Sequence, residues 1–175
     1  MLIAVAALGL FMALLLVAAA NDIATMTIPN WVSVALALTF PVFALAMGYP
    51  LGAVGWHFVF GALVLALGVA LFSAGALGGG DVKVIAAAAI WTGFEGFFTF
   101  LSATLLAGGL LAALLILARR YAEPHDDRPA YLNRLLDPTS GAPYAVAIAI
   151  GGLIALPALP FTFAAWGLQV ALTSP

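Results

Sequence analysis

The chain of 175 residues is 66% hydrophobic and only 7% charged, with a formal net charge of −2 at pH 7. An ordinary soluble domain is about 25% charged and about half apolar. A soluble protein this short exposes much of its surface, and five basic and seven acidic side chains cannot cover it. The composition therefore excludes soluble, disordered and nucleic-acid-binding proteins and predicts an integral membrane protein.

Cysteine is absent, and the two histidines, His57 and His125, lie far apart in the sequence. The chain therefore offers no disulfide, no thiol nucleophile and no histidine-rich metal site. We expect neither a metal nor another cofactor.

Continuous apolar runs, divided by polar or turn-forming residues, predict about six transmembrane helices. A helix needs about 20 apolar residues to cross a bilayer core of about 30 Å. The predicted spans lie near 2–21, 29–48, 51–74, 82–94 and 97–118, with a sixth in the tail from Ala142, kinked by Pro157 and Pro160. Because the runs are continuous and not alternating, helices are favoured over a membrane barrel. The predicted fold class is all-α, a polytopic membrane protein.

The charged residues predict how the chain is oriented in the membrane. Before a polar loop at about 119–141, the only charged residues are Asp22, Asp81, Lys83 and Glu95. With six spans, Lys83 and the arginines of the loop fall on one face, which the positive-inside rule makes cytoplasmic. Asp22 and Asp81 lie on the same face, and both termini lie on the other.

Asp22 and Asp81 are the candidate catalytic residues, because each ends an apolar span. An ionisable group at membrane depth costs about 2.5–3.5 kcal/mol, so such groups are usually functional or paired. Two carboxylates close together cannot both ionise easily, so they share one proton. The ionised member can deprotonate a water, and the protonated member can hydrogen-bond to a scissile carbonyl. In the other interpretation, each aspartate is only a helix cap or boundary residue.

The segment after Asp22 predicts a short ordered turn into the next helix. Pro29 suits the first turn of that helix, where its missing N–H costs nothing. Thr25 or Thr27 is the expected cap. Asn30 can donate a hydrogen bond to a carboxylate or face lipid headgroups.

Three glycines, residues 78–80, precede Asp81. Glycine is poor in a helix, but it permits positive φ and close approach of another backbone. The run therefore suits either a flexible loop beside an extended peptide or a plain turn. Lys83 does not face Asp81 on a helix, and it has either a direct role or a snorkelling one.

Asp22 with Ile28-Pro29-Asn30, together with Gly78-Gly79-Gly80-Asp81-Val82-Lys83, resembles the motifs of the type IV prepilin peptidases, membrane aspartyl proteases of the GxGD type. The small size and the segment from Pro143-Tyr144-Ala145 resemble the short branch that serves tight-adherence (Flp) pili. The resemblance implies that Asp22 and Asp81 are the catalytic pair. It implies supporting motif residues at Gly78, Gly80, Lys83, Pro29 and Asn30.

The same resemblance implies the substrate and the location. The expected activity is removal of a short basic leader from Flp-like prepilins or pseudopilins at the cytoplasmic border of the bacterial inner membrane. We expect one membrane-embedded peptidase domain over residues 1–175, with the polar loop in the cytoplasm and the precursor's hydrophobic helix in the bilayer. Larger members carry cysteine tetrads and also methylate the new N-terminus, an activity not expected for a chain without cysteine.

The alternative function is a small proton- or cation-coupled membrane transporter, whose two aspartates would bind the ion. Transporters usually hold the ion near the midplane of discontinuous helices. Here the aspartates lie at span ends beside a glycine run, which favours the peptidase.

Other polar and aromatic residues are predicted to be structural. His57 is expected to be a satisfied buried histidine, and Glu95 to lie in an external turn. Interfacial positions near helix ends are expected for the tryptophans, Trp31, Trp56, Trp91 and Trp166.

Overall fold

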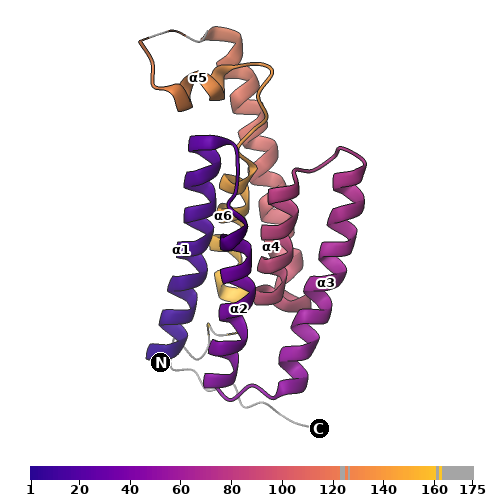
Figure 1. Cartoon of the computed structure of the whole chain (residues 1–175). Helices are drawn as coiled ribbons and strands as arrows, with labels where there is room; N and C mark the ends of the chain where they lie inside the picture. The colour runs from indigo at the N-terminus through magenta and orange to yellow at the C-terminus, as the bar shows by residue number, and fades with distance from the viewer. Residues whose placement is uncertain (123–124, 126, 161, 163–175) are drawn as a thin grey trace.

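In the computed structural model, which describes residues 1–122, 125, 127–160 and 162, the regular elements are all helical. They are α1 (Leu2–Thr25), α2 (Asn30–Ala46), α3 (Leu51–Ser73), α4 (Gly79–Tyr121), α5 (Ala130–Leu136), α6 (Tyr144–Ala155) and a short 3₁₀ turn, η1 (Leu156–Ala158). The long helices form one bundle, and α5 lies apart from it beyond the end of α1 (Figure 1).

Three helices, α1, α3 and α4, are long and apolar enough to cross a membrane, while α2 and α6 are shorter apolar helices. The predicted all-α membrane fold is confirmed. The predicted sixth span is only partly seen, because α6 ends at Ala155 and η1, with Pro157, follows it. Of the residues after η1, only 159, 160 and 162 are described.

The predicted fourth and fifth spans form one element, α4, which is broken at Gly93. Gly93 has φ 60° and ψ −174°, a conformation that glycine adopts without a Cβ penalty. The chain reverses there, so the first half (residues 79–92) and the second half (residues 94–121) run in opposite directions (Figure 1). At 1.5 Å per residue, the first half is about 21 Å long, shorter than a bilayer core of about 30 Å.

His57 on α3 holds this break. The last carbonyls before a helix break lose their amide partners, and His57 Nδ1 lies 2.6 Å from the carbonyl oxygen of Ile90. A Cβ on Gly93 would lie 2.8 Å from His57 Cε1, so only glycine leaves room for the ring. The histidine is satisfied, as the sequence predicts, and its partner is the backbone at the break.

Small residues bring α6 close to both α1 and α4. A Cβ on Gly151 would lie 2.0 Å from Thr104 Oγ1 of α4, and one on Gly152 would lie 2.3 Å from Leu15 Cδ1 of α1. Such close backbone approach is how helices associate in a membrane, where lipid is as apolar as the side chains. The packing fixes α6 between α1 and α4 (Figure 1), and with it the N-terminal end of α6.

Trp91 lies in the centre of the bundle and not at an interface. Its side chain is fully buried, and its indole N–H donates to the carbonyl of Leu36 at 2.7 Å. The interfacial prediction is wrong for Trp91 because the indole donor finds a carbonyl partner inside the protein. Trp31 and Trp56 are exposed, in keeping with the prediction. Trp166 lies outside the described residues.

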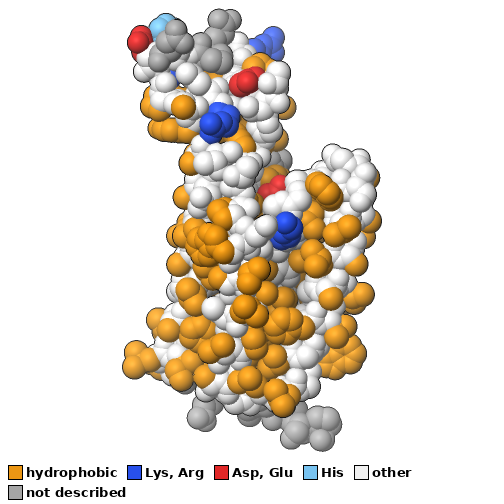
Figure 2. Space-filling view, in the orientation of Figure 1, with side chains coloured by type: hydrophobic (Ala, Val, Ile, Leu, Met, Phe, Trp, Pro, Cys, Tyr) orange, Lys and Arg blue, Asp and Glu red, His pale blue; other side chains and the backbone are white. Residues whose placement is uncertain are grey.

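One end of the molecule carries the polar features. The C-terminal end of α1, the N-terminal end of α4 and the segment with α5 point the same way, away from the chain's N-terminus (Figure 1). Figure 2 shows the basic and acidic side chains on the visible face gathered toward this end, whereas hydrophobic side chains dominate the rest. Because the two halves of α4 run in opposite directions, Lys83 at its start and the polar loop after its end lie toward the same end. The predicted order of spans also places them on one face.

Candidate active site

Asp22 lies in the last turn of α1 and is 7% exposed. The amide N–H of Ala145, the second residue of α6, donates to its Oδ2 at 3.0 Å. The first amides of a helix have no partner inside the helix, and Pro143, the N-cap residue of α6, makes no side-chain cap. Asp22 thus supplies, from α1, a cap that α6 lacks, and negative charge is favourable at that helix end.

Asp81 occupies the third position of α4, after the N-cap residue Gly78. The backbone of Gly78 hydrogen-bonds to the Asp81 carboxylate, the reach of an acidic residue back to the N-cap amide that stabilises helix starts. A Cβ on Gly78 would lie 2.6 Å from Asp81 Oδ2. Capping is therefore part of what this aspartate does, and the glycine makes room for its carboxylate.

The carboxylates of Asp22 and Asp81 interact electrostatically with each other. Among the described residues, the ion-pair geometry that is observed joins only His125 and Asp127, so neither Asp22 nor Asp81 has a cation as a partner. Two like charges that interact without a counter-ion resist double ionisation. If each aspartate were only a helix cap, the two carboxylates would not need to interact, because each could cap its own helix end separately.

Residues of the two predicted motifs also contact each other. Lys83 Nζ donates to Asn30 Oδ1 at 2.9 Å, and a Cβ on Gly80 would lie 3.3 Å from the Ile28 Cβ. These contacts bind the α1–α2 connection to the start of α4. Asn30 thus bonds to a lysine, whereas the sequence suggested a carboxylate or lipid headgroups.

The start of α2 differs in detail from the prediction. Pro29 is the N-cap residue, one position before the first helical residue, and no side chain caps the helix. The Thr25 hydroxyl donates to the carbonyl of Asn21 at 2.9 Å and lies 2.7 Å from the Thr27 hydroxyl. The predicted threonine cap is wrong because Thr25 is still in the last turn of α1, where a hydroxyl bonds back to the preceding carbonyl.

Tyr144 is a residue of the site that the sequence interpretation missed. It begins α6, directly before the amide that binds Asp22, and it interacts electrostatically with Asp81. Its ring lies over α4, where a Cβ on Gly108 would be 2.4 Å from Tyr144 Cε2. Formally charged residues stand out in an apolar sequence, whereas a phenol and a main-chain amide carry no charge at neutral pH. The only signal was the Pro143-Tyr144 start of a helix after the polar loop.

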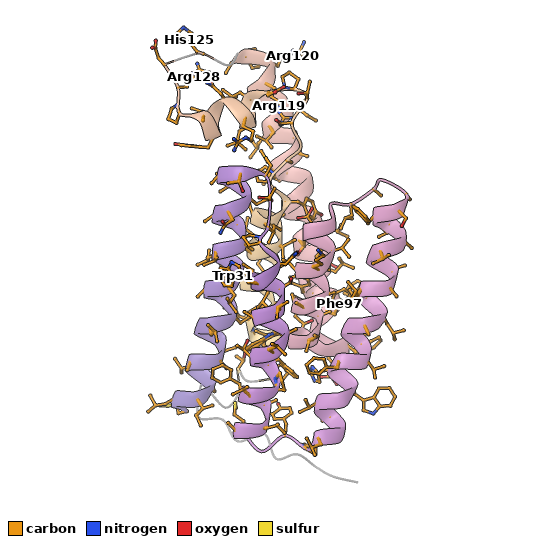
Figure 3. The ribbon with its side chains drawn as sticks, viewed as in Figure 1. Trp31, Phe97, Arg119, Arg120, His125 and Arg128 are labelled. Atoms are coloured by element: carbon orange, nitrogen blue, oxygen red, sulfur yellow. The ribbon has the colours of Figure 1, made fainter. Side chains whose placement is uncertain are left out.

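Two arginines tie the polar loop to the bundle. Arg134 on α5 donates to the carbonyl of Ala24, near Asp22, and Arg119 donates to the carbonyls of Leu135 at 2.9 Å and Gly141 at 2.8 Å. In Figure 3, Arg119, Arg120 and Arg128 lie at the end of the molecule that carries α5, beyond the bundle. The loop is therefore anchored next to the end of α1 that bears Asp22.

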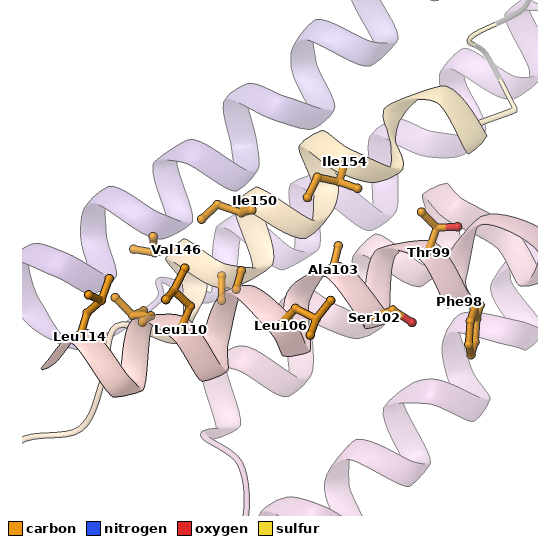
Figure 4. A pocket seen from close by; sticks show the side chains of 13 residues that line it. Phe98, Thr99, Ser102, Ala103, Leu106, Leu110, Leu114, Val146, Ile150 and Ile154 are labelled. Atoms are coloured by element: carbon orange, nitrogen blue, oxygen red, sulfur yellow. The ribbon is translucent and has the colours of Figure 1, made fainter. Parts of the chain in front are cut away.

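An apolar groove of about 720 Å³ runs between the second half of α4 and α6. Leu106, Leu110, Val146 and Ile150 are among its lining residues (Figure 4). Neither aspartate nor Tyr144 lines it, so the groove is separate from the carboxylates. Within the described part of the chain, no group of three or more His, Asp or Glu residues lies close enough to hold a metal ion.

Fold and site together define a class: a helical membrane protein with two carboxylates paired at the polar end of its bundle. The chain matches the model of the type IV leader peptidase family over residues 9–115. It therefore belongs to this family, and the resemblance to the prepilin peptidases is confirmed. The matched range contains Asp22 and Asp81, whereas Tyr144 lies beyond it. Comparisons with curated proteins and with solved structures gave no match.

Membership of this family makes the protein a membrane peptidase and implies a prepilin substrate. It does not favour the alternative of a proton- or cation-coupled transporter.

Proposed function

We propose that the protein is an aspartyl endopeptidase that removes the short basic leader from Flp-like type IV prepilins or pseudopilins, with Asp22 and Asp81 as its catalytic pair. One observation carries the proposal: the two carboxylates come from different helices and interact with each other. Each is also held by a backbone hydrogen bond, from Ala145 and Gly78 respectively.

In the proposed mechanism, Asp22 and Asp81 share one proton, so one carboxylate is ionised and the other is protonated. The ionised carboxylate takes a proton from a water, whose oxygen attacks the carbonyl carbon of the scissile peptide bond. The protonated carboxyl donates to the carbonyl oxygen and stabilises its developing negative charge. When the tetrahedral intermediate collapses, the C–N bond breaks and the nitrogen leaves with a proton from the pair. The backbone amides that bind the carboxylates keep both oriented through these steps.

The supporting residues act through position. Gly78 and Gly80 leave space for the Asp81 carboxylate and for Ile28. Lys83 and Asn30 join the two motif segments by a hydrogen bond, and Pro29 starts α2 with its φ already fixed.

The cytoplasmic border of the bacterial inner membrane is the proposed location of the site. The start of α4, which contains Asp81 and Lys83, and the end of α1, which contains Asp22, point toward the end that carries α5 and the labelled arginines (Figures 1 and 3). Basic residues favour the cytoplasmic face. A substrate with a hydrophobic helix would lie in the bilayer and present its leader at that face. We propose that residues 1–175 act as one peptidase domain, with the 119–141 loop in the cytoplasm.

The test is leader cleavage by the purified enzyme in detergent, with an Flp-like prepilin as substrate. Asp22→Asn and Asp81→Asn, measured separately, should each lower kcat by about 10²–10⁴-fold. Asp137→Asn is the matched control, because Asp137 is an acid of the loop that bonds to Thr139 and not to the pair. Wild-type rates for both site variants would contradict the proposal.

A further inference from the structure

The hydroxyl of Tyr144 is a hydrogen-bond donor for which no described residue supplies an acceptor. Its ring is half-buried at the start of α6, and the hydroxyl forms no hydrogen bond with any residue that the structure describes. A phenol has an ordinary pKa near 10, so it carries its proton at neutral pH and can donate.

The position of Tyr144 is fixed from two sides. The next residue, Ala145, donates its amide to Asp22 at 3.0 Å, which holds the start of α6 against the end of α1. On the other side, α4 has glycine where the ring lies: a Cβ on Gly108 would be 2.4 Å from Tyr144 Cε2 and 2.9 Å from its hydroxyl oxygen. The phenol also interacts electrostatically with Asp81. Tyr144 therefore directly precedes the amide that binds Asp22, lies within electrostatic range of Asp81 and belongs to a third helix.

Three donors near the carboxylates already have acceptors. The amide of Ala145 is bonded to Asp22, and the backbone of Gly78 is bonded to Asp81. Lys83, the cation closest to Asp81 in sequence, donates to Asn30. A tetrahedral intermediate with a negatively charged oxygen needs donors aimed at that oxygen, and the carboxylate pair has only one proton to offer.

We propose that the Tyr144 hydroxyl is a further catalytic group, which donates a hydrogen bond to the carbonyl oxygen of the scissile peptide bond. This role rests on the proposed function, in which Asp22 and Asp81 activate the water. Tyr144 loses no proton in the reaction; its O–H stays bonded to the substrate oxygen as negative charge develops there.

The first test is Tyr144→Phe, which removes the hydroxyl and keeps the ring against Gly108. Leader cleavage should show kcat lowered by about 10²-fold, with KM changed much less, because the bond strengthens in the transition state. Thermal unfolding should be unchanged. Tyr121→Phe is the matched control, because Tyr121 is 80% exposed at the end of α4, and it should leave kcat unchanged.

A second pair of variants tests the placement of the ring. Gly108→Ala forces the ring to move, whereas a Cβ on the neighbouring Gly109 meets nothing within 4 Å. We expect Gly108→Ala to lower kcat and Gly109→Ala to leave it unchanged. In the Tyr144→Phe background, Gly108→Ala should lower kcat little further, because the hydroxyl that it displaces is already gone.

The pH profile of kcat separates donation to the substrate from an effect on Asp81. A donor to the substrate lowers the height of the profile and leaves its limbs in place. A shifted acidic limb with normal kcat at the optimum, or wild-type kcat in Tyr144→Phe, would overturn the proposal for Tyr144. If Asp22→Asn and Asp81→Asn are inactive in the same assay, the proposed function stands even when this inference fails.

Discussion

A substitution at Gly78 should move the Asp81 carboxylate and have little effect on the stability of the fold. Alanine there would put a Cβ 2.6 Å from Asp81 Oδ2, and the free end of a side chain yields more easily than a backbone. Gly78→Ala should therefore displace the carboxylate and lower kcat by about 10²-fold, with about 1 kcal/mol or less of lost stability. Cleavage rates and thermal unfolding in detergent measure the two effects. Gly9→Ala is the control, because its Cβ meets nothing within 4 Å. An active Gly78→Ala enzyme would show that Asp81 tolerates displacement.

The hydrogen bond between Lys83 and Asn30 makes a different prediction. If these residues act only by joining the two motif segments, Lys83→Met and Asn30→Ala should not lower kcat/KM additively. A double-mutant cycle should give a coupling of about 0.5–1.5 kcal/mol, the usual size for a contacting pair. Additive losses would mean that Lys83 acts independently of Asn30, for example as a snorkelling residue.

Asp137 gives a prediction about pH in the polar loop. The hydroxyl and the amide of Thr139 donate to its carboxylate at 2.7 Å and 2.8 Å, and these bonds hold the pKa of Asp137 below its ordinary value. A group with a lowered pKa keeps its hydrogen bonds until the pH falls through that lowered pKa. Carbon NMR of the carboxyl group should show this, and Thr139→Val should raise the midpoint toward that of free aspartate. An unchanged midpoint in Thr139→Val would contradict the assignment.

At the scale of elements, the break in α4 is the feature on which the position of Asp81 depends. Gly93 has positive φ, and a Cβ there would lie 2.8 Å from His57 Cε1. Gly93→Ala should lower the free energy of unfolding by at least about 1–3 kcal/mol, the cost of a strained backbone position, with the clash against His57 added. Thermal unfolding in detergent measures it, with Gly109→Ala as the control. Equal stability of the two variants would mean that α4 can reverse without glycine.

The sequence is enough to predict an all-α fold of apolar helices, the interruption after Trp91 and the position of Asp22 and Asp81 toward the same end of the molecule. These follow from composition, turn residues and the parity of spans. A short span near 82–94 is also predicted by the sequence, whereas the contact of His57 with the Ile90 carbonyl at the break could not be predicted, because it joins two helices. The amide of Ala145 that binds Asp22 was missed for a similar reason: a main-chain donor has no signature in a residue list. The buried Trp91 shows the same limit, since its partner is a carbonyl of another helix.

At the scale of the whole molecule, the charge distribution and the length of each helix predict which residues reach water on which side. The chain has no cysteine, so a single introduced cysteine can be labelled without background. Only a thiol in contact with water ionises and reacts with a membrane-impermeant reagent. Leu51, Phe94 and Tyr121 are exposed on the isolated molecule, at 75%, 81% and 80%, and thus differ only in their depth in the bilayer.

We expect three different results in intact bacteria. Leu51→Cys, at the start of α3, should react from outside, whereas Tyr121→Cys should react only after the cells are permeabilised. Phe94→Cys should react poorly in both conditions, because the first half of α4 spans about 21 Å of a core of about 30 Å and leaves its turn in lipid. Labelling of Phe94→Cys as fast as Leu51→Cys would mean that this half crosses fully. Labelling of Tyr121→Cys in intact cells would show that the orientation is the opposite of the proposed one. Both aspartates would then lie on the side of the membrane away from the leader.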